Sequence, residues 1–533
     1  MNNYFAGKTA LIVDSNRADL GALRDIFGQF GLASVATAPS ANMGSSYLQA
    51  QTFDFCIVAH ELGRGEKSGL QVVQEALQGG YCPRGTIFVL LVTPAQALQC
   101  AGIVDYPPDL CLTKPLNRSK AQGRLEKLVQ LKGVLASVDS LLEQGQWVAA
   151  QRQYALLEQR YPALRGLLGR LQGQMHLHCR AFAQARDLFA GLGDQRWAPV
   201  GLGRALYGLG DYEGARRCLD TEKVPLLPEA SLPLARSLRI QGQRPAALAL
   251  LRKAVIQAPA MSPLQAELGS LLGQAGDWEL AVGAYREAVR HCRFSSLQCV
   301  EYYCALVRAL LSQIDAKGGA RSVAAEKEAV QTLEHLVRDF QDDPATTVRA
   351  RLLSVEVYRA GGNGPMADQA ARDALRRFEA LELGEQALLL DFLVDALGGG
   401  CMAQEASHAR RNIRSQFVHL GWGRCYLEAL QAFRKGDFAL AYGQFCAADE
   451  LCPGNPSLVL NLVHSGLEWG RKAPSQWLPL VRRCNEGLTE MHFGALGGRQ
   501  QARYHSLWQR LERYYSDMRA GGSEPGVVVL DQD

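Results

Sequence analysis

Long hydrophobic runs, paired cysteines and net charge are all scarce in this sequence, and each scarcity argues against a class of protein. No segment approaches the ~18–20 uninterrupted apolar residues that cross a bilayer, so we expect no insertion into a membrane. The first residues, MNNYFAGKTALIVDS, lack a basic region ahead of their short apolar run, so we expect no signal peptide. The 14 cysteines include no Cys-x-x-Cys pair, which argues against a disulfide framework and for reduced thiols in a cytoplasm. A formal net charge of +4 over 533 residues predicts no nucleic-acid partner.

What the chain does have is length and a change of pattern. A single hydrophobic core does not hold 533 residues, and roughly 100–200 residues per domain predicts three to five units. The composition, with 47% hydrophobic and 21% charged residues, is typical of globular proteins. Near residue 130 the pattern changes, which places the first domain at residues 1–130.

Short β-rich runs alternate with helical stretches over these first 130 residues. Strands are expected at Thr9–Val13, Ser34–Ala38, Phe55–Ala59, Thr86–Val92 and Leu110–Thr113. Helices are expected at Leu20–Phe30, Ser40–Gln51, Gly69–Leu77, Ala95–Val104 and Ser119–Leu131. Five such units predict a flavodoxin-like (βα)5 domain, a parallel sheet with strand order 2-1-3-4-5. Its functional crevice lies at the carboxyl ends of strands 1, 3 and 5.

After residue 130 the chain repeats a turn signature. The segments EQGQWVAA, HCRAFAQA, GLGDYEGA, IQGQRPAA and QAGDWELA each place a turn five residues before an alanine, and RKGDFALA repeats the signature later. A turn glycine that ends one helix, a bulky residue that begins the next and a small alanine between them predict a helical hairpin. One hairpin cannot bury its apolar faces alone, so we expect the hairpins to stack into a superhelix.

This signature resembles the tetratricopeptide repeat, whose unit is about 34 residues. The resemblance implies repeats over residues 131–292, divergent helical hairpins over 293–423 and tetratricopeptide-like helices over 424–515. Residues 516–533 are expected to form a disordered tail. The expected helix at Ser119–Leu131 continues into the first repeat without a proline, which predicts a stiff junction.

The first 130 residues resemble the receiver domain of bacterial two-component response regulators. LIVDSN supplies Asp14 after the first strand but has Ser15 where a second acid is usual. TIFVLLVTPA supplies Thr93, and LCLTKPL supplies Lys114 followed by a proline. In a working receiver these positions hold Mg²⁺ and neutralise the phosphoryl group.

The phosphorylatable aspartate of that family is absent. In FDFCIVAHELGRGEKSG, alignment with the family places Ala59 where the aspartate stands, and a methyl group cannot accept a phosphoryl group. Cys111 stands where receivers often carry a switching aromatic residue. Glu61 can imitate the charge of a phosphoaspartate. We therefore predict a phosphorylation-incompetent pseudo-receiver without a metal.

These patterns together predict a cytoplasmic signalling adaptor that binds partner proteins through its superhelix and its receiver-like domain. No nucleophile–base–acid pattern is found in the sequence, so we expect neither an enzyme nor a cofactor. Two alternatives remain: a phosphorylation-gated response regulator that uses Glu61, His60 or Ser15 as acceptor, and an assembly or scaffold factor for a surface machine. Arginine pairs such as Arg410–Arg411 predict solvated helix faces or, alternatively, a concave groove that binds an acidic peptide or a carboxylate. The sequence leaves the partner and the oligomeric state open, a homo-oligomer included.

Overall fold

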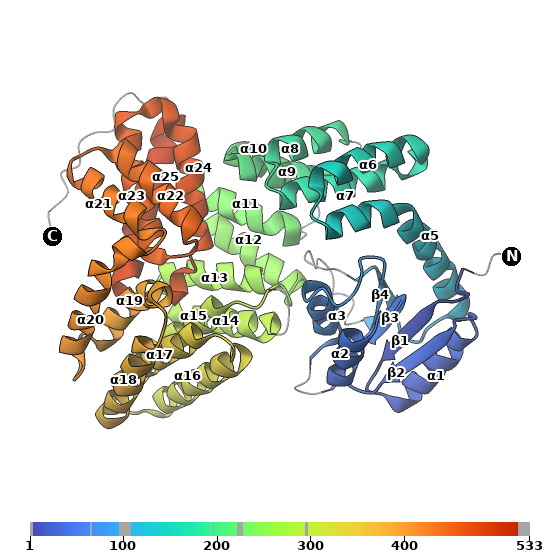
Figure 1. Cartoon of the computed structure of the whole chain (residues 1–533), viewed down its shortest axis with the longest axis horizontal. Coiled ribbons are helices and arrows are strands. Elements are labelled where there is room, and N and C mark those ends of the chain that lie inside the picture. Colours follow the sequence, from blue (N-terminus) through green and yellow to red (C-terminus); the bar gives the residue numbers. More distant parts are fainter. Residues whose placement is uncertain are drawn as a thin grey trace.

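The N-terminal part of the chain forms a five-stranded parallel sheet in a computed structural model that describes residues 4–63, 67–94, 108–193, 195, 197–220, 228–293 and 297–520 (Figure 1). The strands are β1 (Thr9–Val13), β2 (Ser34–Ala38), β3 (Phe55–Ala59), β4 (Ile87–Val92) and β5 (Leu110–Thr113). Their order is β2-β1-β3-β4-β5, which confirms the predicted flavodoxin-like fold. Every residue of β3 and β4 is buried, because helices cover both faces of the sheet.

Two layers of helices enclose the sheet. Helices α1 (Arg17–Gly28) and α5 (Arg118–Glu143) pack on one face, and α2 (Ala41–Ala50) and α3 (Gly69–Gln78) pack on the other. The predicted helix at Ala95–Val104 lies outside the described residues. Helix α1 begins earlier than expected, because the Asn16 side chain accepts hydrogen bonds from the backbone N–H groups of Ala18 and Asp19.

Helix α5 joins the sheet to the superhelix without a break. Its 26 residues, about 39 Å at 1.5 Å per residue, cover the sheet at one end and pack against the next hairpin at the other. The predicted boundary at residue 130 falls inside this helix. The junction is therefore continuous helix, as the absence of proline predicts.

The rest of the described chain is helical, and successive helices pack as antiparallel hairpins. The first set comprises α6 (Trp147–Arg160), α7 (Arg165–His178), α8 (Phe182–Gly191), α9 (Ala198–Leu209), α10 (Tyr212–Leu219), α11 (Pro228–Ile240), α12 (Arg244–Gln257), α13 (Ser262–Gln274) and α14 (Trp278–Cys292). The second set comprises α15 (Val300–Leu311), α16 (Ala320–Asp339), α17 (Pro344–Ala360), α18 (Gly364–Glu379), α19 (Leu383–Leu397) and α20 (Ala403–Ser415). The last set comprises α21 (Gly423–Arg434), α22 (Phe438–Leu451), α23 (Pro456–Lys472), α24 (Trp477–Glu490) and α25 (Gly498–Arg519). This is the predicted tetratricopeptide-type superhelix.

The residues of the turn signature adopt the backbone conformation and the burial that their types predict. The glycines of the signature have left-handed backbone, with φ between 68° and 85°, and Arg180 takes φ 57° in the repeat that lacks one. The alanines of the signature are all fully buried: Ala150, Ala185, Ala215, Ala247, Ala281 and Ala441. A larger side chain at these positions would hold the two helices of the hairpin apart.

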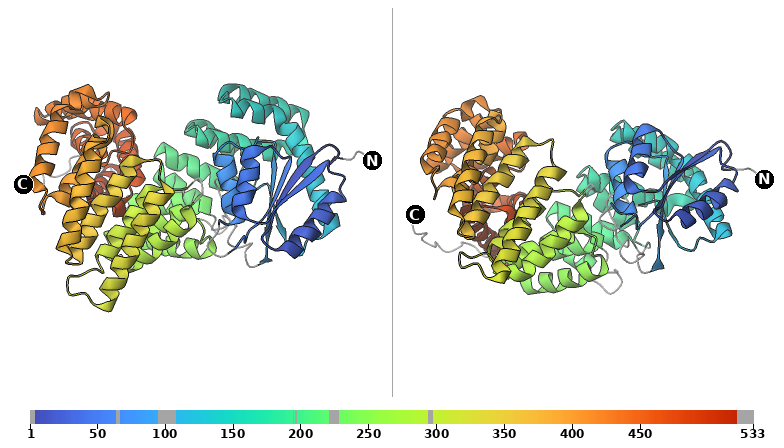
Figure 2. Two further views of the ribbon diagram at one scale, coloured as in Figure 1. Left: turned by 60° about the horizontal axis from the view of Figure 1, so that its bottom comes forward. Right: turned by 90° about the horizontal axis from the view of Figure 1, so that it is seen from below.

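The C-terminal helices lie inside the curve of the superhelix. We call α24, the short turn η4 (Phe493–Ala495) and α25 the C-terminal block. It packs against α11, α13 and α15, far away in sequence, and Figures 1 and 2 show these red helices within the green, yellow and orange ones. Part of the inner side of the superhelix is therefore occupied by the chain itself.

The described part of the C-terminus is helical. Helix α25 continues to Arg519, so the first residues of the predicted 516–533 tail are helical, because Met518 packs against the aromatic residues of the block. Residues 521–533 lie outside the described part. Among the described helices, none combines the length and the apolar composition needed to cross a bilayer.

Candidate functional site

The strand-end site at the N-terminal sheet is built around a buried carboxylate. Asp14 directly follows β1 and is almost fully buried. Its Oδ2 lies 2.6 Å from Nζ of Lys114, and its Oδ1 accepts a hydrogen bond of 3.0 Å from the N–H of Asn16. A second carboxylate, Asp19, lies 2.9 Å from the same Lys114 nitrogen. The lysine therefore pairs with two acids at once and offsets the charge of one of them.

The electrostatics of Lys114 follow from these contacts. Burial lowers the pKa of Lys114, but the hydrogen bonds and charges of Asp14 and Asp19 outweigh it and raise the pKa above its ordinary value. Asp19 was not among the site residues that the sequence predicted. Its signal is an acidic residue in the first turn of a helix that begins just after the first strand.

Ala59, the residue that the sequence resemblance aligns with a phosphorylatable aspartate, is enclosed by neighbouring atoms. Ala59 ends β3 and is 2% exposed. A side chain on Gly69, at the start of α3, would lie 2.0 Å from the carbonyl oxygen of Ala59. The N–H of Gly69 donates to the carbonyl oxygen of His60 at 2.8 Å. Helix α3 thus begins directly against the end of β3.

The remaining predicted residues lie at the same edge of the sheet. Ser15, Glu61 and Thr93 are exposed and follow β1, β3 and β4. Cys111 is exposed and lies within β5. The structure thus brings Asp14 and Lys114 into direct contact and places Ser15, Glu61 and Thr93 around the same carboxyl edge. Among the residues that the structure describes, no three His, Cys, Asp or Glu side chains gather closely enough to hold a metal.

A second candidate site is formed where the C-terminal block meets the superhelix. The guanidinium of Arg239, itself 2% exposed, donates to the hydroxyl of Tyr504 at 2.6 Å and lies 3.6 Å from the ring centre of Trp508. Arg244 makes a two-pronged ion pair with Glu512, at 3.0 and 3.2 Å. These contacts fix the block to α11 and α12 and leave openings beside it.

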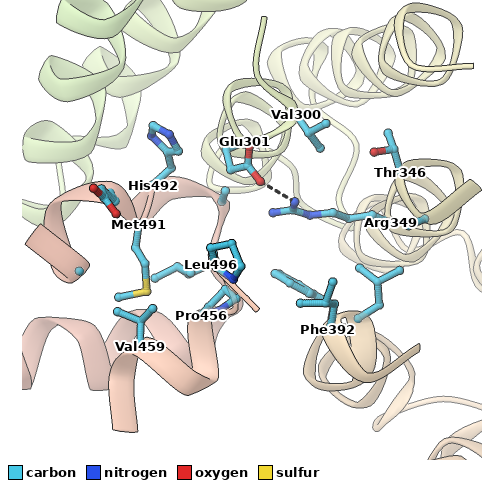
Figure 3. Close-up of a pocket in the computed structure, with 18 of the residues that line it drawn as sticks. Val300, Glu301, Thr346, Arg349, Phe392, Pro456, Val459, Met491, His492 and Leu496 are labelled. Atoms are coloured by element: carbon cyan, nitrogen blue, oxygen red, sulfur yellow. Dashed lines mark hydrogen bonds and ion pairs between the residues drawn. The ribbon is translucent and has the colours of Figure 1, made fainter. Parts of the chain in front are cut away.

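The first opening is a cavity of about 490 Å³ between α15, α17, α19 and the block (Figure 3). Its walls combine apolar side chains with ion pairs. The apolar residues shown in the close-up include Val300, Phe392, Val459, Met491 and Leu496. Glu301 and Arg349 form an ion pair of 2.9 Å at one side, and Arg483 pairs with Asp449 at another.

The surroundings of Glu301 and His492 shift the pKa of each of these two cavity residues. Burial raises the pKa of Glu301, but Arg349, the Cys299 thiol and His492 outweigh it and lower the pKa to about 2. The pKa of His492 is lowered, mainly by burial. At neutral pH the cavity therefore presents an ionised Glu301 and a neutral His492.

The second opening is a cavity of about 380 Å³ between α7, α9, α11 and α24. It is lined by aromatic residues and arginines, among them Phe182, Tyr207, Arg204 and Arg236. Glu490, at the end of α24, lines both cavities. We call the two cavities together the inner groove.

The sequence did not predict the inner groove. It is built by residues from position 177 to position 496, and its walls form only because the C-terminal block folds back. The one local signal was the aromatic content of YHSLWQRLERYY (residues 504–515), which is too high for a helix exposed on all sides.

Comparison with known proteins gives partial likenesses. No family model matches the chain. Over 165 residues it is 30% identical to the alginate biosynthesis transcriptional regulatory protein AlgB of Pseudomonas aeruginosa, covering 30% of this chain. The chain thus spans about a third (33%) of the length of the curated relative it matches.

Similar solved structures superpose on this chain with low TM-scores. A tetratricopeptide repeat protein from Parabacteroides merdae has a TM-score of 0.30 and 13% identity, covering 51% of this chain and 98% of its own. The human IFIT1 dimer with m7Gppp-AAAA has a TM-score of 0.27 and 16% identity, covering 72% and 89%. The Rap conjugation gene regulator of plasmid pLS20, in complex with the Phr* peptide, has a TM-score of 0.24 and 17% identity, covering 56% and 79%. These values give no basis for assigning the ligands of those proteins to this chain.

Proposed function

We propose that this protein is a cytoplasmic signal-transduction adaptor that binds an extended segment of a partner protein in the inner groove. Its N-terminal sheet is then a receiver-like domain that is not phosphorylated. The inner groove carries the proposal, because its two cavities of about 490 and 380 Å³ share Glu490 and together are lined by helices from α7 to α24. A concave site of this length suits an extended chain better than a compact small molecule.

The chemistry of the groove supports protein recognition. Apolar side chains such as Leu388, Phe392 and Met491 offer anchoring contacts for apolar residues of a partner. The pair Glu301–Arg349 supplies charges that fix direction and register. A glutamate with a pKa of about 2 is a poor proton donor or acceptor at neutral pH, which favours binding over acid–base chemistry.

The N-terminal domain is placed to influence the superhelix. It continues into the repeats through α5, and the side-chain amide of Gln71 on α3 donates to the carbonyl oxygen of Arg293 at 2.7 Å. A partner that binds the sheet can therefore bias the repeats through two separate connections. The local likeness to a transcriptional regulatory protein supports a regulatory setting for this coupling.

Site-directed photo-crosslinking in cells tests the proposal. Leu388 lines the groove and is 37% exposed, whereas Ile256 on α12 is 79% exposed and does not line the groove. A photoreactive residue at position 388 is expected to capture a protein partner, and the same residue at position 256 is not. The Leu388→Glu variant should lose at least about 90% of the partner, and Ile256→Glu should keep it. Equal crosslinking at both positions, or partner retention by Leu388→Glu, would show that the groove is not the binding site.

A further inference from the structure

A third cavity has a volume of about 540 Å³. The first residues of α25 lie between it and the inner groove. This cavity opens between α19, α20, α21, α23 and α25. Leu496 lines the groove, whereas Arg499 and Gln500, one turn later, line this cavity, so the start of α25 separates the two. The cavity takes no part in the proposed partner site.

Arginine dominates its lining. Five guanidinium groups come from three helices, namely Arg410, Arg414, Arg434, Arg499 and Arg503. The acids of the lining are Asp391 and Asp395, so its net charge is +3. We call this cavity the arginine pocket.

Most of these arginines lack an acidic partner. Within the part of the chain that the structure describes, no side-chain hydrogen bond or ion pair is found for Arg410, Arg414 or Arg434; Arg410 acts on Asp395 through its charge alone, and its Nε is buried without an acceptor. Arg499 lies 3.6 Å from Asp395. A buried guanidinium nitrogen without an acceptor costs free energy, which a bound anion would recover.

Among the described residues, Arg503 also has no ion pair with a carboxylate. Its hydrogen bonds go to neutral oxygens, the side chain of Asn461 at 2.6 Å and the carbonyl of Leu460 at 3.4 Å. Burial lowers the pKa of Arg503 by more than the charges of Tyr426 and Asp391 raise it. Arg503 therefore lies beside the cavity with no carboxylate among its described hydrogen-bond partners.

We propose that the arginine pocket binds a phosphate-bearing ligand. Guanidinium groups donate in pairs to phosphate oxygens, and a phosphate with two or more negative charges offsets a lining of +3. The donors come from α20, α21 and α25, on different sides of the pocket. A tetrahedral phosphate can accept from several directions, whereas a single carboxylate accepts mainly in its own plane. The cavity volume is sufficient for a small phosphorylated compound.

Calorimetric titration of the full-length chain with pyrophosphate tests this assignment. Citrate serves as a carboxylate of similar charge, and a glutamate-rich peptide serves as an acidic protein segment. We expect pyrophosphate to bind at least about tenfold more tightly than either. The variants Arg410→Gln and Arg414→Gln should each weaken it by about tenfold, because each removes a charge-assisted donor.

Arg411→Gln is the matched control, since Arg411 lies on the same helix and is exposed like Arg414, but does not line the cavity. It should leave pyrophosphate binding unchanged. The proposal is overturned if pyrophosphate does not bind, if citrate or the peptide binds as tightly, or if Arg411→Gln weakens binding as much as Arg410→Gln. Thermal unfolding of each variant confirms that the fold is intact. Loss of partner crosslinking at Leu388 would not bear on this result, because the two cavities are separate.

Discussion

At the scale of single residues, the strand-end site combines a preserved charge arrangement with a missing acceptor. Lys114 pairs with Asp14 and Asp19, so its charge is already offset without a phosphoryl group. Ala59, at the end of β3, offers only a methyl group. At this edge of the sheet Lys114 is therefore held by two carboxylates, and the side chain that ends β3 has no polar atom.

The first prediction concerns phosphorylation. Incubation of the protein with acetyl phosphate and Mg²⁺ is expected to give no covalent adduct, because Ala59 cannot accept the phosphoryl group. Intact-mass spectrometry measures the adduct. A mass increase that hydroxylamine removes would contradict the prediction and would favour a carboxylate acceptor. If the Glu61→Gln variant no longer gains this mass and the Glu75→Gln variant still does, the phosphoryl group is attached to Glu61.

His492 predicts a pH effect on stability. Burial is the largest cause that lowers its pKa, and the charges of Arg236 and Arg349 act in the same direction against those of Glu301 and Glu267. In the unfolded chain a histidine binds a proton near pH 6.5. Since the folded state binds this proton less readily, the free energy of unfolding is expected to fall as the pH is lowered through about 6.5.

The measurement is urea denaturation between about pH 8 and pH 5. His492→Gln should reduce the slope of stability against pH by up to about 1.4 kcal/mol per pH unit, the value for one proton. His419→Gln, at an exposed position on the outer surface, should leave the slope unchanged. An unchanged slope in His492→Gln would show that another group controls the acid response.

At the scale of elements, the contact between β3 and α3 depends on one glycine. A Cβ on Gly69 would lie 2.0 Å from the Ala59 carbonyl oxygen and 2.9 Å from a methyl group of Val58. Gly69→Ala should therefore destabilise the protein by about 3 kcal/mol, because backbone atoms must move to relieve the overlap. Chemical denaturation followed by circular dichroism measures the change.

Gly283 provides the control for this substitution. It lies within α14, and a Cβ there meets no atom within 4 Å. Gly283→Ala should stabilise the protein by roughly 0.5–1 kcal/mol, because alanine is the better helix former. Similar effects at both positions would mean that α3 does not pack against the end of β3 as described.

The helical hairpins show how far local sequence decides an element. The signature glycines adopt the left-handed turns and the signature alanines are buried, as their residue types predict. These features involve neighbours about five residues apart, so the sequence pattern contains them directly. The end of α25 was placed incorrectly because its last turn depends on the contact of Met518 with distant aromatic residues.

At the scale of the whole molecule, the C-terminal block closes the superhelix. Trp508 is 1% exposed, and its ring packs against both Tyr504 and the guanidinium of Arg239. Trp508→Ala should cost about 3–5 kcal/mol, because it leaves a cavity and removes the contact with the arginine. Urea denaturation monitored by tyrosine and tryptophan fluorescence measures the loss.

Trp147 is the matched tryptophan at the other end of the superhelix. It is 37% exposed at the start of α6, so Trp147→Ala should cost less than about 1.5 kcal/mol. If the two substitutions have equal effects, the C-terminal block is not part of the stable core.

The sequence by itself determined the order of elements, the strand arrangement, the hairpin repeats and the absence of a phosphorylatable residue at position 59. Each of these follows from residue type and short-range periodicity. Only the tertiary structure decided that Asp19 joins Lys114, that the block occupies part of the inner side of the superhelix, and that five arginines surround one cavity. Arg239 and Tyr504 are 265 positions apart, and their contact depends on the cumulative curvature of all the hairpins between them. A small change in the angle at each repeat moves such a contact by many ångströms, and no local pattern records that sum.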